Sequence, residues 1–334
     1  MTARLHEILS LSVLAAGMAC ARAAPSAPGA PAVITAARVM TYNIRHGAGN
    51  DDCATPPSEP GTLPSPDCAL NLERIAAIIR AERVDVAGLQ EVDRFWARSG
   101  MVDQPAALGA MLGMQTCYGA NLAHPPDAHS AAPHEYGTLV LSRHPIVACG
   151  NTLLPRAGTA SEQRGLLHTR IRPGDATVDF YNTHLHTAEA DRRLQVDAIV
   201  RQIESPAERV ILVGDLNARP TESYLAPLFA VLKDAWAVAG AGPGFTSPAS
   251  PAQPPRNRID YVLVSPALAV TAATILTTPQ TAVASDHYPV VCDVKLPGAA
   301  PGSAGLLLPS GRQSASAPIA TGPLRNGRQH RVDR

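Results

Sequence analysis

Short apolar runs alternate with amphipathic stretches through the middle of this chain, and the alternation predicts an α/β fold. In residues 70–83, Leu72, Ile75, Ile78 and Ile79 recur at helical spacing. Helices are expected over 70–83, 104–112 and 191–203. Strands are expected over 36–44, 84–92, 136–150, 177–187, 209–218, 258–265 and 288–296. No repeat of solenoid length accompanies these elements.

The two ends of the chain differ from this pattern. Residues 24–36 are rich in Ala and Pro and are interpreted as a linker. Residues 297–334 are rich in Gly, Pro, Ser and Ala with scattered Arg, which predicts a disordered, mildly basic tail. Residues 37–296 therefore form one predicted domain.

The first 23 residues resemble an export signal. Arg4 and His6 precede an apolar run from Ile8 to Ala21, and residues 21–23 form an A-x-A-like cleavage site. The run is shorter than the roughly 20 apolar residues of a membrane span. We therefore expect no transmembrane span and an exported protein, periplasmic or secreted. A lipoprotein anchored through Cys20 is the minor alternative.

Five cysteines remain after the predicted signal. Cys53 and Cys68 bracket a Pro-rich loop that a disulfide would restrain, and Cys117 and Cys149 are a second possible pair. Cys292 lies in an apolar run and is expected to be a buried thiol. No cysteine or histidine spacing suggests zinc.

The charge balance limits the classes of partner. The formal net charge is +0, which argues against a dominant electrostatic grip on nucleic acid or on an anionic membrane. A local basic patch remains compatible with this total. Hydrophobic residues make up 46% of the chain, enough for a substantial core.

Polar and ionisable residues recur where predicted strands begin or end. The set is Asn43, Glu91, His184, Asp215, Asn217, Asp260, Asp286 and His287. In α/β sheets, ligands bind outside strand ends, where side chains stand on a rigid base. A single acid there is usually a solvated turn residue, but so many together favour an active site.

These residue types suit hydrolysis at phosphorus. Glu91 and Asp286 are hard oxygen donors of the kind that bind Mg²⁺ or Mn²⁺. His287 is suited to contact a phosphate or accept a proton, with Asp260 as the carboxylate that orients it.

The remaining strand-end residues complete this interpretation. Asp215 would align an attacking water, and Asn217 would hold that water or the phosphate. His184 would either donate to a nonbridging oxygen or protonate the leaving group.

The motifs "TYN", "LQEVD", "YGTLVLSRHPI", "NTHL", "GDLNARP", "RIDYVLVS" and "SDHYPV" together resemble the endonuclease/exonuclease/phosphatase superfamily of metal-dependent phosphodiesterases. The resemblance runs from Asn43 to Asp293 in the family's order. It implies a four-layer sandwich of two mixed β-sheets flanked by helices. It also implies metal positions at Asn43, Glu91 and Asp286, and catalytic positions at His184, Asp215, Asn217, Asp260 and His287.

Two further residues are candidate phosphate contacts, the first as a weaker family match and the second because a guanidinium suits the role. Tyr136 falls where many members place a phosphate-contacting tyrosine, and Arg164 is expected to add a phosphate-binding charge. "NTHL", with His184, leans toward the branch of secreted deoxyribonucleases, sphingomyelinases and inositol-polyphosphate phosphatases. The insert at 51–68 is either a lip over the site or a decorative loop.

Other conspicuous residues have ordinary explanations. We expect exposed histidines at 124, 129 and 134, a solvated His186, solvated charges at Arg94 and Arg98, and packing roles for Trp96 and Trp236.

The sequence thus predicts a secreted phosphodiesterase dependent on Mg²⁺ or Mn²⁺, most simply endonuclease-like, with no protein partner implied. The alternative substrates are lipid head groups, as in sphingomyelinases, or small phosphorylated molecules. A non-catalytic binding protein of the same fold is disfavoured, because every mapped position holds a competent residue.

Overall fold

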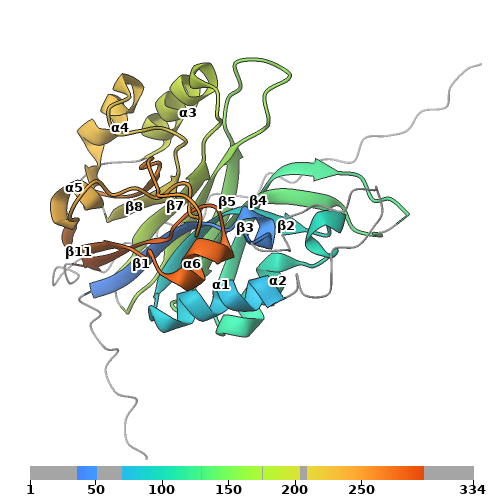
Figure 1. Ribbon diagram of the computed structural model, residues 1–334. Coiled ribbons are helices and arrows are strands. Elements are labelled where there is room, and N and C mark those ends of the chain that lie inside the picture. The colour runs from blue at the N-terminus through green and yellow to red at the C-terminus, as the bar shows by residue number, and fades with distance from the viewer. Residues whose placement is uncertain (1–35, 51–69, 129, 175, 204–208, 297–334) are drawn as a thin grey trace, which may run out of the picture. The chain divides into compact units, whose positions relative to one another are not determined.

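Two six-stranded mixed β-sheets pack face to face in this computed structural model, and helices cover their outer faces (Figure 1). The structure describes residues 36–50, 70–128, 130–174, 176–203 and 209–296. The predicted signal peptide, the tail, the insert at 51–68 and nearly all of the linker lie outside the described residues. The predicted sandwich of two mixed sheets is confirmed.

The first sheet has the strand order β11-β12-β1-β2-β4-β3. Its strands are β1 (Ala36–Asn43), β2 (Val86–Arg94), β3 (Gln115–His124), β4 (His134–Ser142), β11 (Ala269–Ile275) and β12 (Val290–Lys295). Only β1 and β2 run parallel, and they lie at the centre of the sheet.

The second sheet repeats this plan with the order β5-β6-β7-β8-β10-β9. Its strands are β5 (Ile146–Leu153), β6 (Gly165–Ile171), β7 (Val178–His184), β8 (Val210–Asp215), β9 (Lys233–Asp234) and β10 (Asp260–Val264). Here β7 and β8 form the central parallel pair. Each sheet therefore offers one pair of parallel strand ends at its middle.

The helices are α1 (Leu70–Ala81), α2 (Gln104–Leu112), α3 (Glu189–Gln202), α4 (Ala226–Val231), α5 (Ala235–Ala239) and α6 (Pro279–Ala284). Apolar residues of α1 and α2 pack on the outer face of the first sheet. Those of α3 and α4 pack on the outer face of the second sheet. None of the helices in the described ranges is long and apolar enough to cross a membrane.

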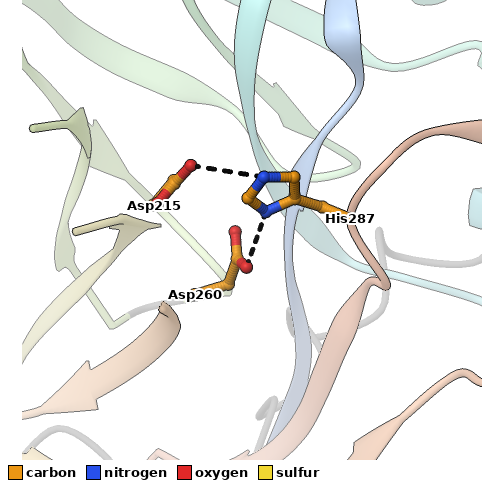
Figure 2. A group of neighbouring side chains, drawn as sticks. All are labelled: Asp215, Asp260 and His287. Carbon is orange, nitrogen blue, oxygen red and sulfur yellow. Dashed lines mark hydrogen bonds and ion pairs between the residues drawn. The ribbon is translucent and has the colours of Figure 1, made fainter. Parts of the chain in front are cut away.

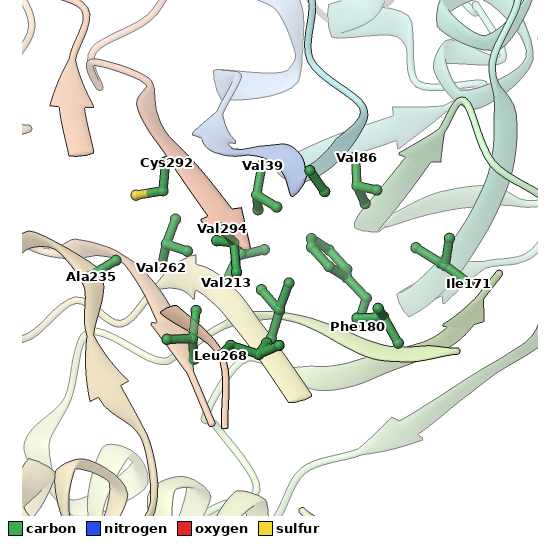
Figure 3. Close-up of a cluster of buried hydrophobic side chains, with 14 of the residues drawn as sticks. Val39, Val86, Ile171, Phe180, Val213, Ala235, Val262, Leu268, Cys292 and Val294 are labelled. Atoms are coloured by element: carbon green, nitrogen blue, oxygen red, sulfur yellow. The ribbon is translucent and has the colours of Figure 1, made fainter. Parts of the chain in front are cut away.

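A third apolar cluster fills the space between the sheets (Figure 3). Val39 and Val294 from the first sheet meet Phe180, Val213 and Val262 from the second, and all are buried. Since the central strands are covered on both faces, an apolar run such as that of β8 marks them in the sequence, although β7 also carries buried polar residues. This packing fixes the two parallel pairs against each other.

A disulfide joins edge strands of the two sheets. Cys117 of β3 bonds Cys149 of β5, with their Cα atoms 5.9 Å apart. We call this bond the intersheet disulfide; it confirms the second pair considered from sequence. Cys292 is a buried free thiol, as expected.

The sequence pattern missed several elements. Strands β3, β6 and β11 and the short helices α4 to α6 were not expected. The predicted strand over 136–150 is wrong as a single element, because the turn at 143–145 divides it into β4 and β5.

Candidate active site

Strand ends from both sheets bring polar side chains to one edge of the sandwich. Asn43 is the last residue of β1. His184 and Asp215 are paired across the ends of the parallel strands β7 and β8. Asp260 lies opposite Asp215, because β10 starts where the antiparallel strand β8 ends. The sheet register thus places residues that are distant in sequence next to one another.

The last two of the predicted site residues lie in the turn between α6 and β12. It carries Asp286 and His287, and β12 runs antiparallel to β1. Ser285 Oγ donates a hydrogen bond to the backbone oxygen of Asn43 at 2.7 Å. Asn50 Nδ2 donates to the backbone oxygen of Ser285 at 2.7 Å. These bonds hold the turn against the end of β1.

Asp215, Asp260 and His287 form the tightest cluster of carboxylates and imidazole among the described residues (Figure 2). His287 Nδ1 lies 2.8 Å from Asp260 Oδ2, and His287 Nε2 lies 3.7 Å from Asp215 Oδ2. All three side chains are buried. The predicted contact of His287 with an orienting Asp260 is present.

The charges in this cluster shift the acid strength of its members. Burial alone would lower the pKa of His287, but the charges of Asp260 and Asp215 outweigh burial and raise that pKa well above its ordinary value. Burial and the charge of Asp260 raise the pKa of Asp215 to about 7. The cluster can therefore exchange a proton in the range where a hydrolase needs one.

Asp215 connects the cluster to the rest of the site. Its Oδ2 atom accepts a hydrogen bond from Asn43 Nδ2 at 3.1 Å and lies 3.5 Å from His184 Nε2. Its Oδ1 atom accepts from the backbone N–H of Asn217 at 2.8 Å. One carboxylate thus fixes the relative positions of three of the predicted site residues.

His184 is enclosed by two nitrogen-bearing side chains. Its Nδ1 lies 2.8 Å from Arg164 Nη1, and its Nε2 lies 3.1 Å from Asn217 Nδ2. Burial, followed by the positive charge of Arg164, lowers the pKa of His184 well below its ordinary value. Arg164 is itself only 6% exposed and pairs with Glu162, so it lies behind His184.

Glu91 reaches the same edge by a local break in strand β2. The β2–β4 register shifts between Leu89 and Val92, and Glu91 adopts a positive φ of 59°. Its Oε1 accepts from Asn43 Nδ2 at 2.9 Å, and its Oε2 lies 3.8 Å from His46 Nδ1. Burial would raise the pKa of Glu91, but these neighbours and the nearby site histidines hold it well below the usual range.

The donor chemistry of this corner fits a hard divalent cation. Glu91 stays ionised, and Asp286 offers a second, more exposed carboxylate whose Oδ2 lies 3.9 Å from Arg45 Nε. Asn43 turns its Nδ2 toward Glu91 and Asp215, while its Oδ1 accepts from the backbone N–H of Arg45 at 3.0 Å. In this arrangement Asn43 links Glu91 to Asp215, and the carboxylates of Glu91 and Asp286 are of the oxygen-donor type that Mg²⁺ prefers.

Tyr136 lies in β4 directly opposite Asp93 and makes no hydrogen bond through its hydroxyl within the described residues. The guanidinium of Arg98 lies 5.2 Å from the Tyr136 ring and is held by Asp93 at 2.8 and 2.9 Å. Burial and the charge of Glu91 raise the pKa of Tyr136, so its hydroxyl remains a donor.

Two expectations about surface residues, His134 and Arg94, were wrong. His134 is buried, and its Nε2 lies 3.2 Å from Asp127 Oδ2. Arg94 is half-buried and paired with two carboxylates, whereas Arg98 is exposed as expected and also pairs with the buried Asp93. His124 is exposed as expected, and position 129 lies outside the described residues.

The sequence interpretation also overlooked two residues beside the predicted cation corner. Arg45 and His46 directly follow the Asn43 motif, and both adopt positive φ values of 47° and 44°. Each lies within 4 Å of a predicted metal-binding carboxylate. Their position next to Asn43 was the available signal.

Comparison with known proteins agrees with this geometry. The model of the Endonuclease/Exonuclease/phosphatase family matches residues 40–287. An endonuclease/exonuclease/phosphatase structure from Beutenbergia cavernae DSM 12333 is 28% identical, with a TM-score of 0.56, covering 78% of this chain and 72% of that one.

Two further solved structures share the fold at lower identity. The human Nocturnin catalytic domain with a bound sulfate anion is 22% identical, with a TM-score of 0.57 and coverage of 78% and 95%. A mannosyl-6-phosphatase from Bacteroides thetaiotaomicron VPI-5482 is 19% identical, with a TM-score of 0.58 and coverage of 77% and 99%.

Proposed function

Because the chain belongs to the endonuclease/exonuclease/phosphatase family, whose members are hydrolases acting on phosphoesters, we propose that it is a divalent-metal-dependent phosphodiesterase. The observation that carries this proposal is the buried group of Asp215, His287 and Asp260 beside an ionised Glu91. It combines a proton acceptor with a carboxylate suited to a cation, and phosphodiester hydrolysis needs both.

The proton acceptor is assigned to Asp215 in this group. Asp260 accepts a hydrogen bond from Nδ1 of His287, and the raised pKa of His287 keeps the imidazole protonated, with its Nε2 3.7 Å from Oδ2 of Asp215. An attacking water held by Asp215 would pass its proton to this carboxylate, next to the charged imidazole. The reaction then proceeds by attack on phosphorus without a covalent protein intermediate.

Glu91 and Asp286 are proposed to hold Mg²⁺, with Mn²⁺ as a substitute, and Asn43 to keep Glu91 in place. When bound, the cation would neutralise phosphate oxygens and stabilise the developing charge on the leaving oxygen. Tyr136 is proposed to donate its hydroxyl proton to a phosphate oxygen, since that hydroxyl forms no hydrogen bond within the described residues.

The first candidate substrate, which rests on the resemblance of "NTHL" to the branch that includes secreted deoxyribonucleases, is nucleic acid, cleaved by an endonuclease-like reaction in an exported protein. The second candidate is a phosphoester of a lipid head group or of a small molecule. The net charge of +0 favours this second candidate, because it provides no general attraction for a polyanion. The fold shared with a mannosyl-6-phosphatase is a second reason to consider a small phosphorylated molecule as the substrate.

The test is hydrolysis of plasmid DNA, RNA, sphingomyelin and bis-p-nitrophenyl phosphate by the purified chain. EDTA should abolish activity, and Mg²⁺ or Mn²⁺ should restore it. His287→Ala should lower turnover by at least ~100-fold. The matched control is His168→Ala, because His168 also contacts a carboxylate, Asp179, at 2.7 Å but lies outside the site.

Activity that survives the chelator would overturn the metal assignment, and equal activities of the two histidine variants would remove His287 from the mechanism. Cleavage of sphingomyelin without cleavage of plasmid would reverse the order of the two substrate candidates.

A further inference from the structure

The guanidinium of Arg98 is held in a fixed position beside the candidate site. Its Nε and Nη2 atoms donate to the two carboxylate oxygens of Asp93 at 2.9 and 2.8 Å. Its Cζ atom lies 4.9 Å from the ring centre of Trp96 and 5.2 Å from that of Tyr136. Asp93 is 0% exposed, so water does not compete for its two oxygens. The orientation of the Arg98 side chain is therefore set before any substrate arrives.

The two N–H groups of Arg98 Nη1 form an outer edge of this guanidinium. An arginine carries five N–H donors, and Asp93 accepts hydrogen bonds from only two of them. Nη1 donates no hydrogen bond within the part of the chain that the structure describes, and the Arg98 side chain is 39% exposed. The outer edge thus presents ordered donors at the surface. Such donors orient a bound ligand at a low cost in entropy.

Tyr136 connects Arg98 to the residues that are proposed to hold the reacting phosphate. It is paired with Asp93 across strands β4 and β2, and Glu91 lies two residues before Asp93 in β2. Burial raises the pKa of Tyr136, the charge of Glu91 raises it further and the charge of Arg98 lowers it, so both charges act on this hydroxyl. Because Arg98 contacts the ring whose hydroxyl is proposed to bind the phosphate, its outer edge reaches the group attached directly to that phosphate.

The charges around Arg98 disfavour a second phosphate at its outer edge. Asp93 neutralises the guanidinium of Arg98, and the nearby Arg94 is paired with two carboxylates. Two guanidinium groups therefore face three carboxylates, and the ionised Glu91 lies on the same strand as Asp93. An uncharged group with oxygen acceptors suits this environment better than an anion does.

In nucleic acids and in glycosyl phosphodiesters, the uncharged group next to phosphorus is a sugar, whose hydroxyl and ring oxygens accept hydrogen bonds. We propose that Arg98 is a specificity residue, and that its outer edge binds the oxygens of a sugar attached to the scissile phosphate. This inference rests on the proposed phosphodiesterase function and narrows its substrate. The sugar is either the pentose of a nucleotide or the hexose of a small glycosyl phosphodiester, and the binding test below distinguishes these two sources.

The kinetic test compares a substrate that carries a sugar with one that does not. Thymidine 5′-(p-nitrophenyl phosphate) has a pentose next to phosphorus, and bis-p-nitrophenyl phosphate has the same leaving group without the pentose. Arg98→Lys keeps a cation against Asp93 but removes the outer edge. The double variant Asp93→Asn/Arg98→Gln removes both charges, so no buried carboxylate is left without a partner. Both variants should lower kcat/KM at least ~10-fold more for the thymidine ester than for bis-p-nitrophenyl phosphate.

Arg38 and Asp293 provide the matched control. Nε and Nη2 of Arg38 donate to the two oxygens of Asp293 at 2.7 and 2.8 Å, and the Arg38 side chain is also 39% exposed. Arg38 lies near the start of β1, whereas the site residue Asn43 is the last residue of that strand. The double variant Asp293→Asn/Arg38→Gln should change kcat/KM by less than about threefold for both substrates. Equal losses with the two substrates in the Arg98 variants would show that Arg98 only holds Tyr136 in place, and would overturn the proposal.

A binding test does not depend on turnover. In calorimetric titrations of the full chain, ribose 5-phosphate or glucose 6-phosphate should bind more tightly than phenyl phosphate, and this preference should disappear in Arg98→Lys. Tighter binding of the ribose ester would identify a nucleotide as the source of the sugar, and tighter binding of the glucose ester a glycosyl phosphodiester. If phenyl phosphate binds as tightly as both sugar phosphates, the proposal is refuted. If the chain hydrolyses no phosphodiester, the proposed function fails, while the titrations still decide the sugar contact.

Discussion

The amide of Asn182 forms hydrogen bonds between the two sheets, two residues before His184 of the candidate site. Asn182 lies in β7, and its Nδ2 donates to the backbone oxygens of Leu89 at 2.9 Å and Leu139 at 3.0 Å, in β2 and β4. Its Oδ1 accepts from Gln90 Nε2 at 2.8 Å. The residue is 0% exposed, so water cannot replace these bonds. We predict that Asn182→Ala is among the more destabilising single substitutions in this chain.

The size of the effect follows from the three lost bonds. Each buried hydrogen bond contributes about 1 kcal/mol net, which gives a loss of about 3 kcal/mol. Gln90 keeps two other acceptors, Thr41 Oγ1 and the backbone oxygen of Gly88, both at 3.1 Å, so its amide adds no large further penalty. For a domain of this size, 3 kcal/mol lowers Tm by roughly 6–12 °C.

Urea unfolding and thermal melts of the two forms would measure this difference. Asn151→Ala is the matched control, because Asn151 Nδ2 also donates twice, to Ala120 at 3.0 Å and to Asn121 at 3.1 Å. Asn151 is half-buried and makes two such bonds rather than three, so the loss should be smaller, about 2 kcal/mol at most. If both variants lose the same stability, burial does not govern these amide bonds and the reasoning is refuted.

Two further predictions concern stability. Reduction of the intersheet disulfide, which closes a sequence separation of 32 residues, should lower the free energy of unfolding by about 4 kcal/mol, and a double Cys→Ala variant should melt at the same temperature with or without reductant. Burial would raise the pKa of Asp179, but hydrogen bonds from His168 and Arg170 outweigh it and lower that pKa. The carboxylate therefore stabilises the fold above the unfolded pKa of about 4, and this contribution is lost as the pH falls through the folded value. Asp179→Asn should cost stability at pH 7 and progressively less below pH 4 in urea titrations, whereas Asn at the exposed Asp197 should cost little at any pH.

The central strands were predictable because they are buried on both faces. Strands β1, β2, β8, β10 and β12 each contain a short apolar run, whereas β7 mixes apolar and polar residues although all seven are buried. Strand β11 lacks such a run, since its residues alternate between exposed and half-exposed and consist largely of Ala and Thr. A strand can be recognised as an apolar run in the sequence only when most of its residues are buried.

The site residues were predictable as a set, but their partners were only partly so. The contact between Asp260 and His287 was expected, because a base needs an orienting acid. Arg164 was expected to add a phosphate-binding charge, and in the structure it is buried against His184, a contact that the sequence did not indicate. The sequence does not show that the Arg164 side chain is buried, because its burial depends on how the loop before β6 packs.

Glu91 shows why even a recognised motif does not reveal its own geometry. In a regular strand, alternation would place Glu91 on the same face as Leu89, which packs in the apolar cluster under α1. The register shift between Leu89 and Val92 breaks that alternation, and the left-handed backbone turns the carboxylate toward Asn43. Such a conformation costs a non-glycine residue about 1–3 kcal/mol, and glutamate has no local preference for it. The left-handed conformation of Glu91 persists because β2 is paired with its neighbours on both sides of this residue. The backbone strain therefore lies at the residue that is proposed to bind the cation. A regular strand would have buried the Glu91 carboxylate instead.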